Sequence, residues 1–174
     1  LLIAVSLKFF DRENSYLFNT FVTLFFLLAF SKLCIALHEL GHALFATMAC
    51  GRVRRFVLGE GTEIVRFRWL GVLVIIHSKI TSGHTYASFE NKLHLKWKQL
   101  LYTSGGFVTN FFLAGLVALL FEGKETAGYI DLSIAFIVPN IFVGIFALLP
   151  YKHNRMGYQI PSDGLRIFML LFNK

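Results

Sequence analysis

The 174-residue chain is poor in charge, in proline and in cysteine. Charged residues make up 16% of the sequence, whereas an ordinary soluble domain carries about a quarter. Two cysteines are too few for the disulfide framework of a small secreted domain. The shortage of charge, together with 56% hydrophobic residues and 20 phenylalanines, argues against a soluble globular protein. It favours an integral membrane protein instead.

The charge that is present is mostly basic, and the formal net charge is +7. A basic excess can indicate nucleic-acid binding when it forms one stripe, but here Lys and Arg lie between apolar runs. Residues 51–98 hold nine of them and residues 151–161 hold two. We therefore expect no nucleic-acid partner. Contacts with membrane lipids and the positive-inside rule explain the basic loops, which we expect to be cytoplasmic.

Several apolar segments approach the ~20 residues that an α-helix needs to cross a bilayer. Three of them cover residues 16–37, 100–121 and 129–150, and a shorter fourth covers residues 165–172. The sequence thus predicts a mainly α, polytopic integral membrane protein with about four transmembrane helices. We expect a single domain over residues 1–174. The chain begins without a methionine, and we expect its natural N-terminus to lie further upstream.

Residues 51–98 have a different pattern from the apolar spans. Alternating or β-branched runs at residues 52–58, 63–69 and 72–78 are separated by glycines, which is typical of strands and turns. We predict a small sheet or hairpins. Because open sheet edges are not tolerated against lipid, we expect this segment to be membrane-associated and covered by protein, headgroups or water.

An HExxH motif, His38 to His42, stands at the end of the first apolar span. On a helix, residues i and i+4 share a face, so both imidazoles can bind one metal ion. Gly41 leaves room for another backbone to approach. Ionisable side chains in a span are costly without partners, which favours a functional site over a chance match. We predict one Zn²⁺ ion bound by His38 and His42, with Glu39 as the catalytic base toward water.

A catalytic zinc site needs a third protein ligand. Asp163 is the leading candidate, because it precedes a short apolar segment on the same predicted side of the membrane as His42. Alternatively, Asp163 is only a helix N-cap or turn residue, and Glu60 or Glu63 is the ligand. Cys34 shares the helical face of the motif, and we interpret it as a small buried side chain.

Two further motifs follow the HExxH motif in the chain. Residues 104–110, Ser-Gly-Gly-Phe-Val-Thr-Asn, lie in the second apolar span, and Leu149-Pro150 precedes Asp163-Gly164. In this order the motifs resemble those of the site-2 protease family of intramembrane zinc metalloproteases, peptidase family M50. Gly106 stands where that family usually has proline, and Ala147 near the place of a frequent asparagine. The resemblance implies that Asp163 ligates zinc and that residues 51–98 form a membrane-associated sheet.

The resemblance implies a zinc-dependent intramembrane endopeptidase that cleaves transmembrane segments of protein substrates. We expect it in a bacterial cell membrane, with the active site toward the cytoplasmic side. An unwound substrate stretch could add as a strand to residues 51–98. The alternatives are a catalytically silent membrane scaffold or sensor of the same fold, and a membrane metal transporter. Intact Glu39 argues against the scaffold, and the small number of spans argues against the transporter.

Each of three more polar residues has two possible roles. Asn110 is a candidate catalytic residue that could align a substrate carbonyl or stabilise the oxyanion, or else an interhelical hydrogen-bonding group. Asn140 follows Pro139 in the third span, where we expect a structural role at a kink. For His84 we expect a surface position rather than a place near the metal.

Overall fold

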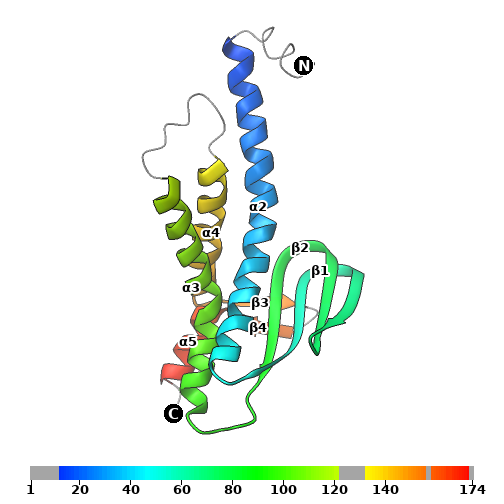
Figure 1. The fold of residues 1–174 in the computed structure, drawn as a ribbon, viewed down its shortest axis with the longest axis vertical. Coiled ribbons are helices and arrows are strands. Elements are labelled where there is room, and N and C mark those ends of the chain that lie inside the picture. The colour runs from blue at the N-terminus through cyan, green and yellow to red at the C-terminus, as the bar shows by residue number, and fades with distance from the viewer. Residues whose placement is uncertain (1–11, 122–131, 156–157, 173–174) are drawn as a thin grey trace.

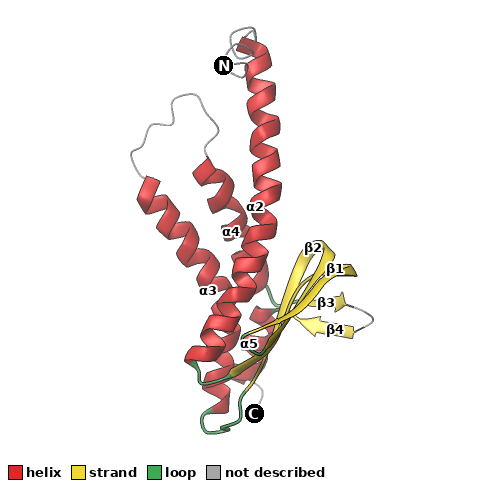
Figure 2. Cartoon of the chain, turned by 45° about the vertical axis from the view of Figure 1, so that its right-hand side comes forward, coloured by secondary structure: helices red, strands yellow, loops and turns green. Residues whose placement is uncertain are grey.

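The computed structural model describes residues 12–121, 132–155 and 158–172 (Figure 1). Four helices are described: α2 (Arg12–Met48), α3 (Leu95–Phe121), α4 (Leu132–Leu148) and α5 (Asp163–Phe172). Two hairpins accompany them, β1 (Arg52–Trp69) with β2 (Val72–Ser88), and β3 (Lys152–Arg155) with β4 (Tyr158–Pro161). The long hairpin lies beside the lower half of α2, on the side away from α3 and α4 (Figures 1 and 2).

Helix α2 is the longest element, with 37 residues and a length of about 55 Å. It extends beyond the upper ends of α3 and α4 (Figure 1). Its upper half exposes large apolar side chains, among them Phe21 at 70% and Leu28 at 64%. Among the described side chains of α2, the first buried one is Cys34. The packed part of α2 therefore begins one turn before the HExxH motif.

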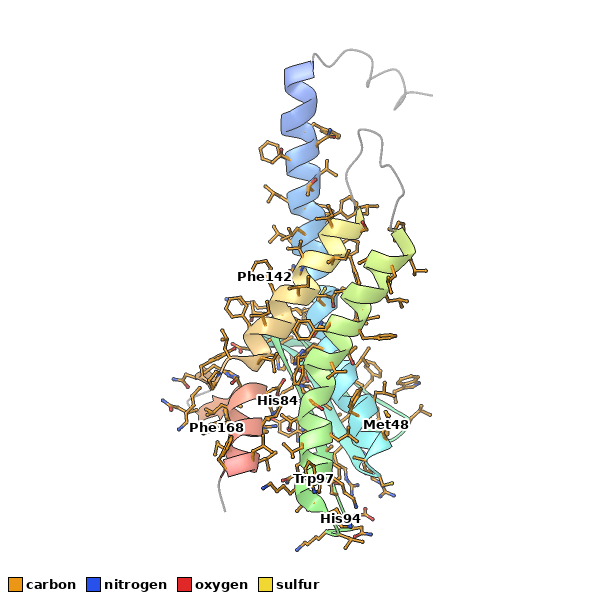
Figure 3. All side chains as sticks on the ribbon, turned by 90° about the vertical axis from the view of Figure 1, so that its left-hand side faces the viewer. Met48, His84, His94, Trp97, Phe142 and Phe168 are labelled. Atoms are coloured by element: carbon orange, nitrogen blue, oxygen red, sulfur yellow. The ribbon has the colours of Figure 1, made fainter. Side chains whose placement is uncertain are left out.

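Two helices are long and apolar enough to cross a membrane, Phe18–Met48 and Leu95–Phe121. Only 6% and 22% of their most apolar windows are buried, whereas the core helix of a soluble protein is apolar because it is buried. Figure 3 shows side chains projecting outward along these helices, with Met48 and Trp97 toward the lower ends. The bundle thus presents an apolar outer surface.

Against the expectation of about four spans, two helices in the described part of the chain are candidate spans, and the 10 described residues of α5 extend about 15 Å. A bilayer core is about 30 Å thick. Helix α4 has 17 residues, so it is shorter than the two candidate spans. The first residues of the third expected span, 129–131, lie outside the described part of the chain.

Helices α2 and α3 approach so closely that their backbones touch. A Cβ atom at Gly41 would lie 2.4 Å from the carbonyl oxygen of Gly105, and one at Gly105 would lie 2.5 Å from that of Gly41. Small residues at such crossings let helices pack at backbone distance. The prediction that Gly41 leaves room for another backbone is confirmed.

The first half of β1 is the centre of the larger sheet. In the antiparallel β1–β2 pairing, residues 55–58 are partnered twice, by residues 83–86 and by residues 73–76 of β2. Partners on both sides explain why Phe56, Val57 and Leu58 are buried. The expected strand runs are therefore present, within strands longer than predicted.

The second hairpin was not expected from the sequence, since residues 151–161 read as a polar loop. Strand β3 has the sequence Lys-His-Asn-Arg, which contains no β-branched or aromatic residue to indicate a strand. Its register pairs Lys152 with Pro161 and His153 with Ile160. The hairpin spans the gap between the end of α4 and the start of α5.

Ser162 ties this hairpin to both helices. Its hydroxyl donates to the carbonyl oxygen of Leu149 (2.6 Å) and accepts the N–H of Leu165 (3.2 Å). The second bond makes Ser162 the N-cap of α5, so Asp163 is not the cap and its carboxylate is left for other contacts. A Cβ atom at Gly164 would lie 1.9 Å from the carbonyl oxygen of Leu148, so glycine is needed where α5 touches α4.

A glycine-to-alanine pair in α3 tests the backbone contact. We expect Gly105→Ala to destabilise the fold by about 1–3 kcal/mol, because the added methyl group overpacks the α2–α3 crossing. A Cβ atom at Gly115 meets nothing within 4 Å, so Gly115→Ala should be neutral or stabilising by about 0.5–1 kcal/mol. Thermal unfolding in detergent micelles compares the two variants, and equal melting temperatures would refute the close contact.

Candidate metal centre

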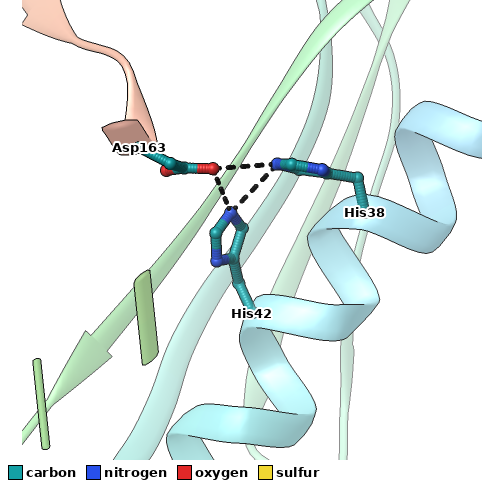
Figure 4. Close-up of side chains that lie close together, drawn as sticks. All are labelled: His38, His42 and Asp163. Carbon is teal, nitrogen blue, oxygen red and sulfur yellow. Dashed lines mark hydrogen bonds and ion pairs between the residues drawn. The ribbon is translucent and has the colours of Figure 1, made fainter. Parts of the chain in front are cut away.

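Three side chains, those of His38, His42 and Asp163, meet at one point (Figure 4). The Nε2 atoms of His38 and His42 are 3.2 Å apart. The Oδ2 atom of Asp163 lies 3.0 Å from the first and 3.1 Å from the second. These atoms form a nearly equilateral triangle. Among the described residues, no other group of three or more His, Cys, Asp or Glu side chains converges in this way.

The triangle is assembled from two distant parts of the chain. His38 and His42 lie one turn apart on α2, and Asp163 is the first residue of α5, 125 positions after His38. The Ser162 cap and the α4–α5 contact at Gly164 place this first turn of α5 against the bundle. The three predicted ligands are therefore brought together by the fold.

The outer nitrogens of both imidazoles are already hydrogen-bonded. Nδ1 of His38 lies 2.7 Å from the Oδ1 atom of Asn110, and Nδ1 of His42 lies 2.9 Å from the carbonyl oxygen of Tyr102. Both partners are acceptors, so each Nδ1 carries the proton. In a neutral ring the Nε2 atom then presents a lone pair. Two lone pairs and a carboxylate oxygen converge on the same point, an arrangement that a cation stabilises.

This donor set fits a zinc ion. Two imidazole nitrogens and one carboxylate oxygen are a common ligand set of catalytic zinc, with bond lengths of about 2.0–2.2 Å. Ligand atoms at those distances in a tetrahedron are about 3.3–3.5 Å apart, close to the separations in the triangle. Histidine ligands also usually donate their second N–H to a carbonyl or carboxylate, as both do here.

Asp163 supplies the negative charge of the site. Burial acts to raise the pKa of its carboxyl group, but when the imidazoles of His38 and His42 are protonated, their hydrogen bonds and charges outweigh burial and hold the pKa below its ordinary value.

Asn110 lies behind His38, away from Asp163, and is fully buried. Its Nδ2 atom donates to the carbonyl oxygen of Cys34 (3.1 Å) and to the Oδ1 atom of Asn140 (2.8 Å). With both amide hydrogens engaged, its Oδ1 atom is fixed as the acceptor for His38. This arrangement leaves no donor for a substrate oxyanion and corresponds to the interhelical alternative considered for Asn110.

Asn140 completes the same network from α4. It is fully buried, and its Nδ2 atom donates to the carbonyl oxygen of Phe136 (2.9 Å). The expected structural role is thus accompanied by a link to the metal ligand through Asn110. A chain of three polar side chains connects α4, α3 and α2.

Gly106 of α3 lies against both imidazoles. A Cβ atom there would lie 2.4 Å from Nε2 of His38 and 2.6 Å from Nε2 of His42. In this chain the backbone of α3 therefore packs directly on the two imidazoles, and only glycine leaves them in place.

Glu39 lies next to the triangle and is 5% exposed. Its Oε2 atom accepts a hydrogen bond from the hydroxyl of Thr85 on β2 (2.8 Å). No sequence pattern indicates a role for Thr85 or Tyr102, since their contacts depend on how β2 and α3 meet α2. Both belong to the site through hydrogen bonds that only the tertiary structure shows.

A cavity of about 510 Å³ opens at the site. It is lined by the three triangle residues and Glu39, by residues 81–85 of β2 and by parts of the β3–β4 hairpin, including His153 and Ile160. His84 belongs to this lining and is half-buried, with its ring 4.5 Å from that of Tyr86 (labelled in Figure 3). The expectation of a surface position for His84 is therefore wrong.

Glu60 and Glu63, the alternative candidates for the third ligand, lie in different parts of the structure. Glu63 is paired with Arg66 at the surface, and this hydrogen bond lowers the pKa of its carboxyl group. Glu60 lines the cavity, where its Oε1 atom accepts a hydrogen bond from Ser82 (2.8 Å). Neither belongs to the converging group.

The network behind His38 can be tested with Asn110→Ala. If Asn110 positions the ring, its loss should weaken zinc binding about 10- to 100-fold, as removal of outer hydrogen-bond partners of metal ligands usually does. Competition with a chelator of known affinity measures this change. Unchanged zinc affinity with a lower turnover number would instead support the oxyanion role.

Comparison with known proteins identifies the family. The sequence model of peptidase family M50 matches residues 25–126, more than half of the 174-residue chain. The match includes His38, Glu39, His42 and Asn110, but not Asp163. A search of curated proteins found no significant match. The family consists of membrane-embedded metalloproteases that in general depend on zinc, and the chain belongs to peptidase family M50.

Proposed function

We propose that this chain is a zinc-dependent intramembrane endopeptidase that cleaves transmembrane segments of protein substrates. Membership of family M50 implies a metalloprotease. The observation that carries the proposal is the convergence of His38, His42 and Asp163 within 3.2 Å of one another, with Glu39 beside them. A silent scaffold would need neither a complete ligand set nor a buried carboxylate next to it.

The chemistry assigns one role to each side chain. A zinc ion held by His38, His42 and Asp163 would supply Lewis acidity toward water and toward a peptide carbonyl. The carboxylate of Glu39 takes a proton from the attacking water and returns it to the nitrogen of the leaving amine. Asn110 and the carbonyl of Tyr102 hold the imidazoles in the tautomer that leaves Nε2 for the ion.

The proposed setting is a bilayer, crossed at least by α2 and α3. Their outer surfaces are apolar and exposed, and lipid is the solvent that suits such surfaces. The basic residues of β1 and of the start of α3 support a cytoplasmic position for the lower end of the bundle under the positive-inside rule. The site then lies between the membrane midplane and the cytoplasmic surface.

A helical substrate must unwind before its peptide bonds can be reached, because helix carbonyls are hydrogen-bonded internally. The cavity offers a place for such an extended stretch, between residues 81–85 of β2 and the β3–β4 hairpin. Strand addition along β2 would hold the stretch through main-chain hydrogen bonds. The proposed substrate-binding part of the sheet is thus the segment next to Glu39.

Three substitutions separate chemistry from metal binding. We expect Glu39→Gln to abolish cleavage of a transmembrane reporter while zinc content stays at one ion per chain, because the amide cannot accept the proton. His38→Ala and Asp163→Ala should lose both zinc and activity. Elemental analysis and a reporter assay with purified protein measure the two quantities.

Glu63→Gln is the matched control for this series, since it makes the same chemical change at the surface and should leave both readouts unchanged. Full zinc content and activity in Asp163→Asn would contradict the third-ligand assignment. Zinc binding without any cleavage in the unaltered protein would favour the scaffold or the transporter.

Cross-linking tests whether a substrate binds as an added strand along β2. In a variant lacking Cys34 and Cys50 and carrying Glu39→Gln, we expect Thr81→Cys to form disulfides with single cysteines at alternate positions of a bound substrate, because strand neighbours alternate in side-chain direction. Ile64→Cys, at an exposed position far along β1, serves as the control. Equal cross-linking at both positions, or none at Thr81→Cys, would contradict binding along β2.

A further inference from the structure

Strand β2 packs on the side chain of Glu39 at Gly83. A Cβ atom at Gly83 would lie 2.3 Å from Cγ of Glu39 and 2.8 Å from its Oε1 atom. A side chain there would displace the carboxylate, so the backbone of β2 is itself one wall of the pocket that holds Glu39.

Thr85 holds the same carboxylate from the next residue on that face of β2. Its hydroxyl lies 2.8 Å from Oε2 of Glu39 and 2.9 Å from the carbonyl oxygen of Glu39. Thr85 is 2% exposed, so water cannot replace this bond. A hydroxyl has one proton, and both acceptors belong to the same residue, so either donation fixes Glu39 relative to β2.

Thr85 is in turn anchored to the part of α3 that supports a metal ligand. The hydroxyl of Tyr102 donates to the main-chain carbonyl of Thr85, and the main-chain carbonyl of Tyr102 accepts the Nδ1 proton of His42. A single path of hydrogen bonds therefore runs from Glu39 through Thr85 and Tyr102 to His42. The path ties Glu39 and His42, which share α2, to strand β2 and to helix α3.

We propose that Thr85 is a positioning residue, whose hydroxyl holds the Glu39 carboxylate in the orientation from which it takes the proton of the attacking water. The assignment rests on the proposed function. In this proposal, strand β2 both lines the substrate-binding cavity and supports the catalytic base Glu39. The side-chain hydroxyl of Thr85 contacts Glu39, so its effect on rate is transmitted through Glu39.

The test removes the hydroxyl group of Thr85 while keeping the volume of its side chain. Thr85→Val should lower kcat about 10- to 100-fold, the usual range for outer partners of a metal site, with KM and zinc content unchanged. Thr85→Ser keeps the hydroxyl and should restore most of kcat, whereas Thr85→Ala should not. Thermal unfolding of each variant in detergent shows whether it is folded. If valine prevents folding, the serine and alanine variants still compare presence and absence of the hydroxyl at nearly constant size.

Thr62→Val is the matched control, because Thr62 is an exposed threonine of β1 whose hydroxyl donates to Ser78 (3.2 Å); all parameters should stay at their original values. The inference is overturned if Thr85→Val retains full kcat, if serine and alanine are equally impaired, or if zinc is lost with the hydroxyl. In each of these cases the unaltered protein is active. An unaltered protein without chelator-sensitive cleavage would instead refute the proposed function, and the role of Thr85 with it.

Discussion

The convergence of two imidazole nitrogens and a carboxylate oxygen is the interaction on which the rest of the structure depends. Lone pairs brought within 3.2 Å of one another repel unless a cation or protons lie between them. Both imidazoles are buried, so the arrangement persists only if rigid elements enforce it. A bound zinc ion would convert this unfavourable geometry into a favourable one, and metal binding would then be coupled to folding.

Small residues and buried amide side chains hold the two imidazoles and the carboxylate together. Gly41 and Gly105 bring α2 and α3 into backbone contact, and Gly106 lets α3 touch both imidazoles. Asn110 and Asn140 fill the space between three helices and are fully hydrogen-bonded, which makes their burial tolerable. Glu39, the three converging side chains and strand β2 are thus parts of one packed unit.

The local part of this arrangement could be predicted from the sequence. The i, i+4 spacing of His38 and His42 follows from helical periodicity, and the strand runs of β1 and β2 follow from their β-branched alternation. Asp163 was identified by its place in a motif. The Ser162 cap, which leaves the Asp163 carboxylate for the triangle, was not foreseen.

What could not be predicted depends on long-range packing. Strand β3 contains no β-branched or aromatic residue to indicate a strand, and the sequence of residues 151–161 reads as a loop. The contact of Thr85 with Glu39 joins positions 46 apart, and no local pattern fixes which threonine of β2 meets the helix. For Asn110 the sequence leaves a catalytic and an interhelical role open, and only the packing of three helices brings its amide hydrogens to Cys34 and Asn140.

Anomalous X-ray scattering at the zinc absorption edge tests the central claim most directly, because it locates the ion and its ligands together. One anomalous peak is expected within bonding distance of His38 Nε2, His42 Nε2 and the Asp163 carboxylate, at about 2.0–2.2 Å from each. A zinc-loaded crystal whose peak lies elsewhere, for example at Glu60, or whose two imidazoles point apart, would contradict the account.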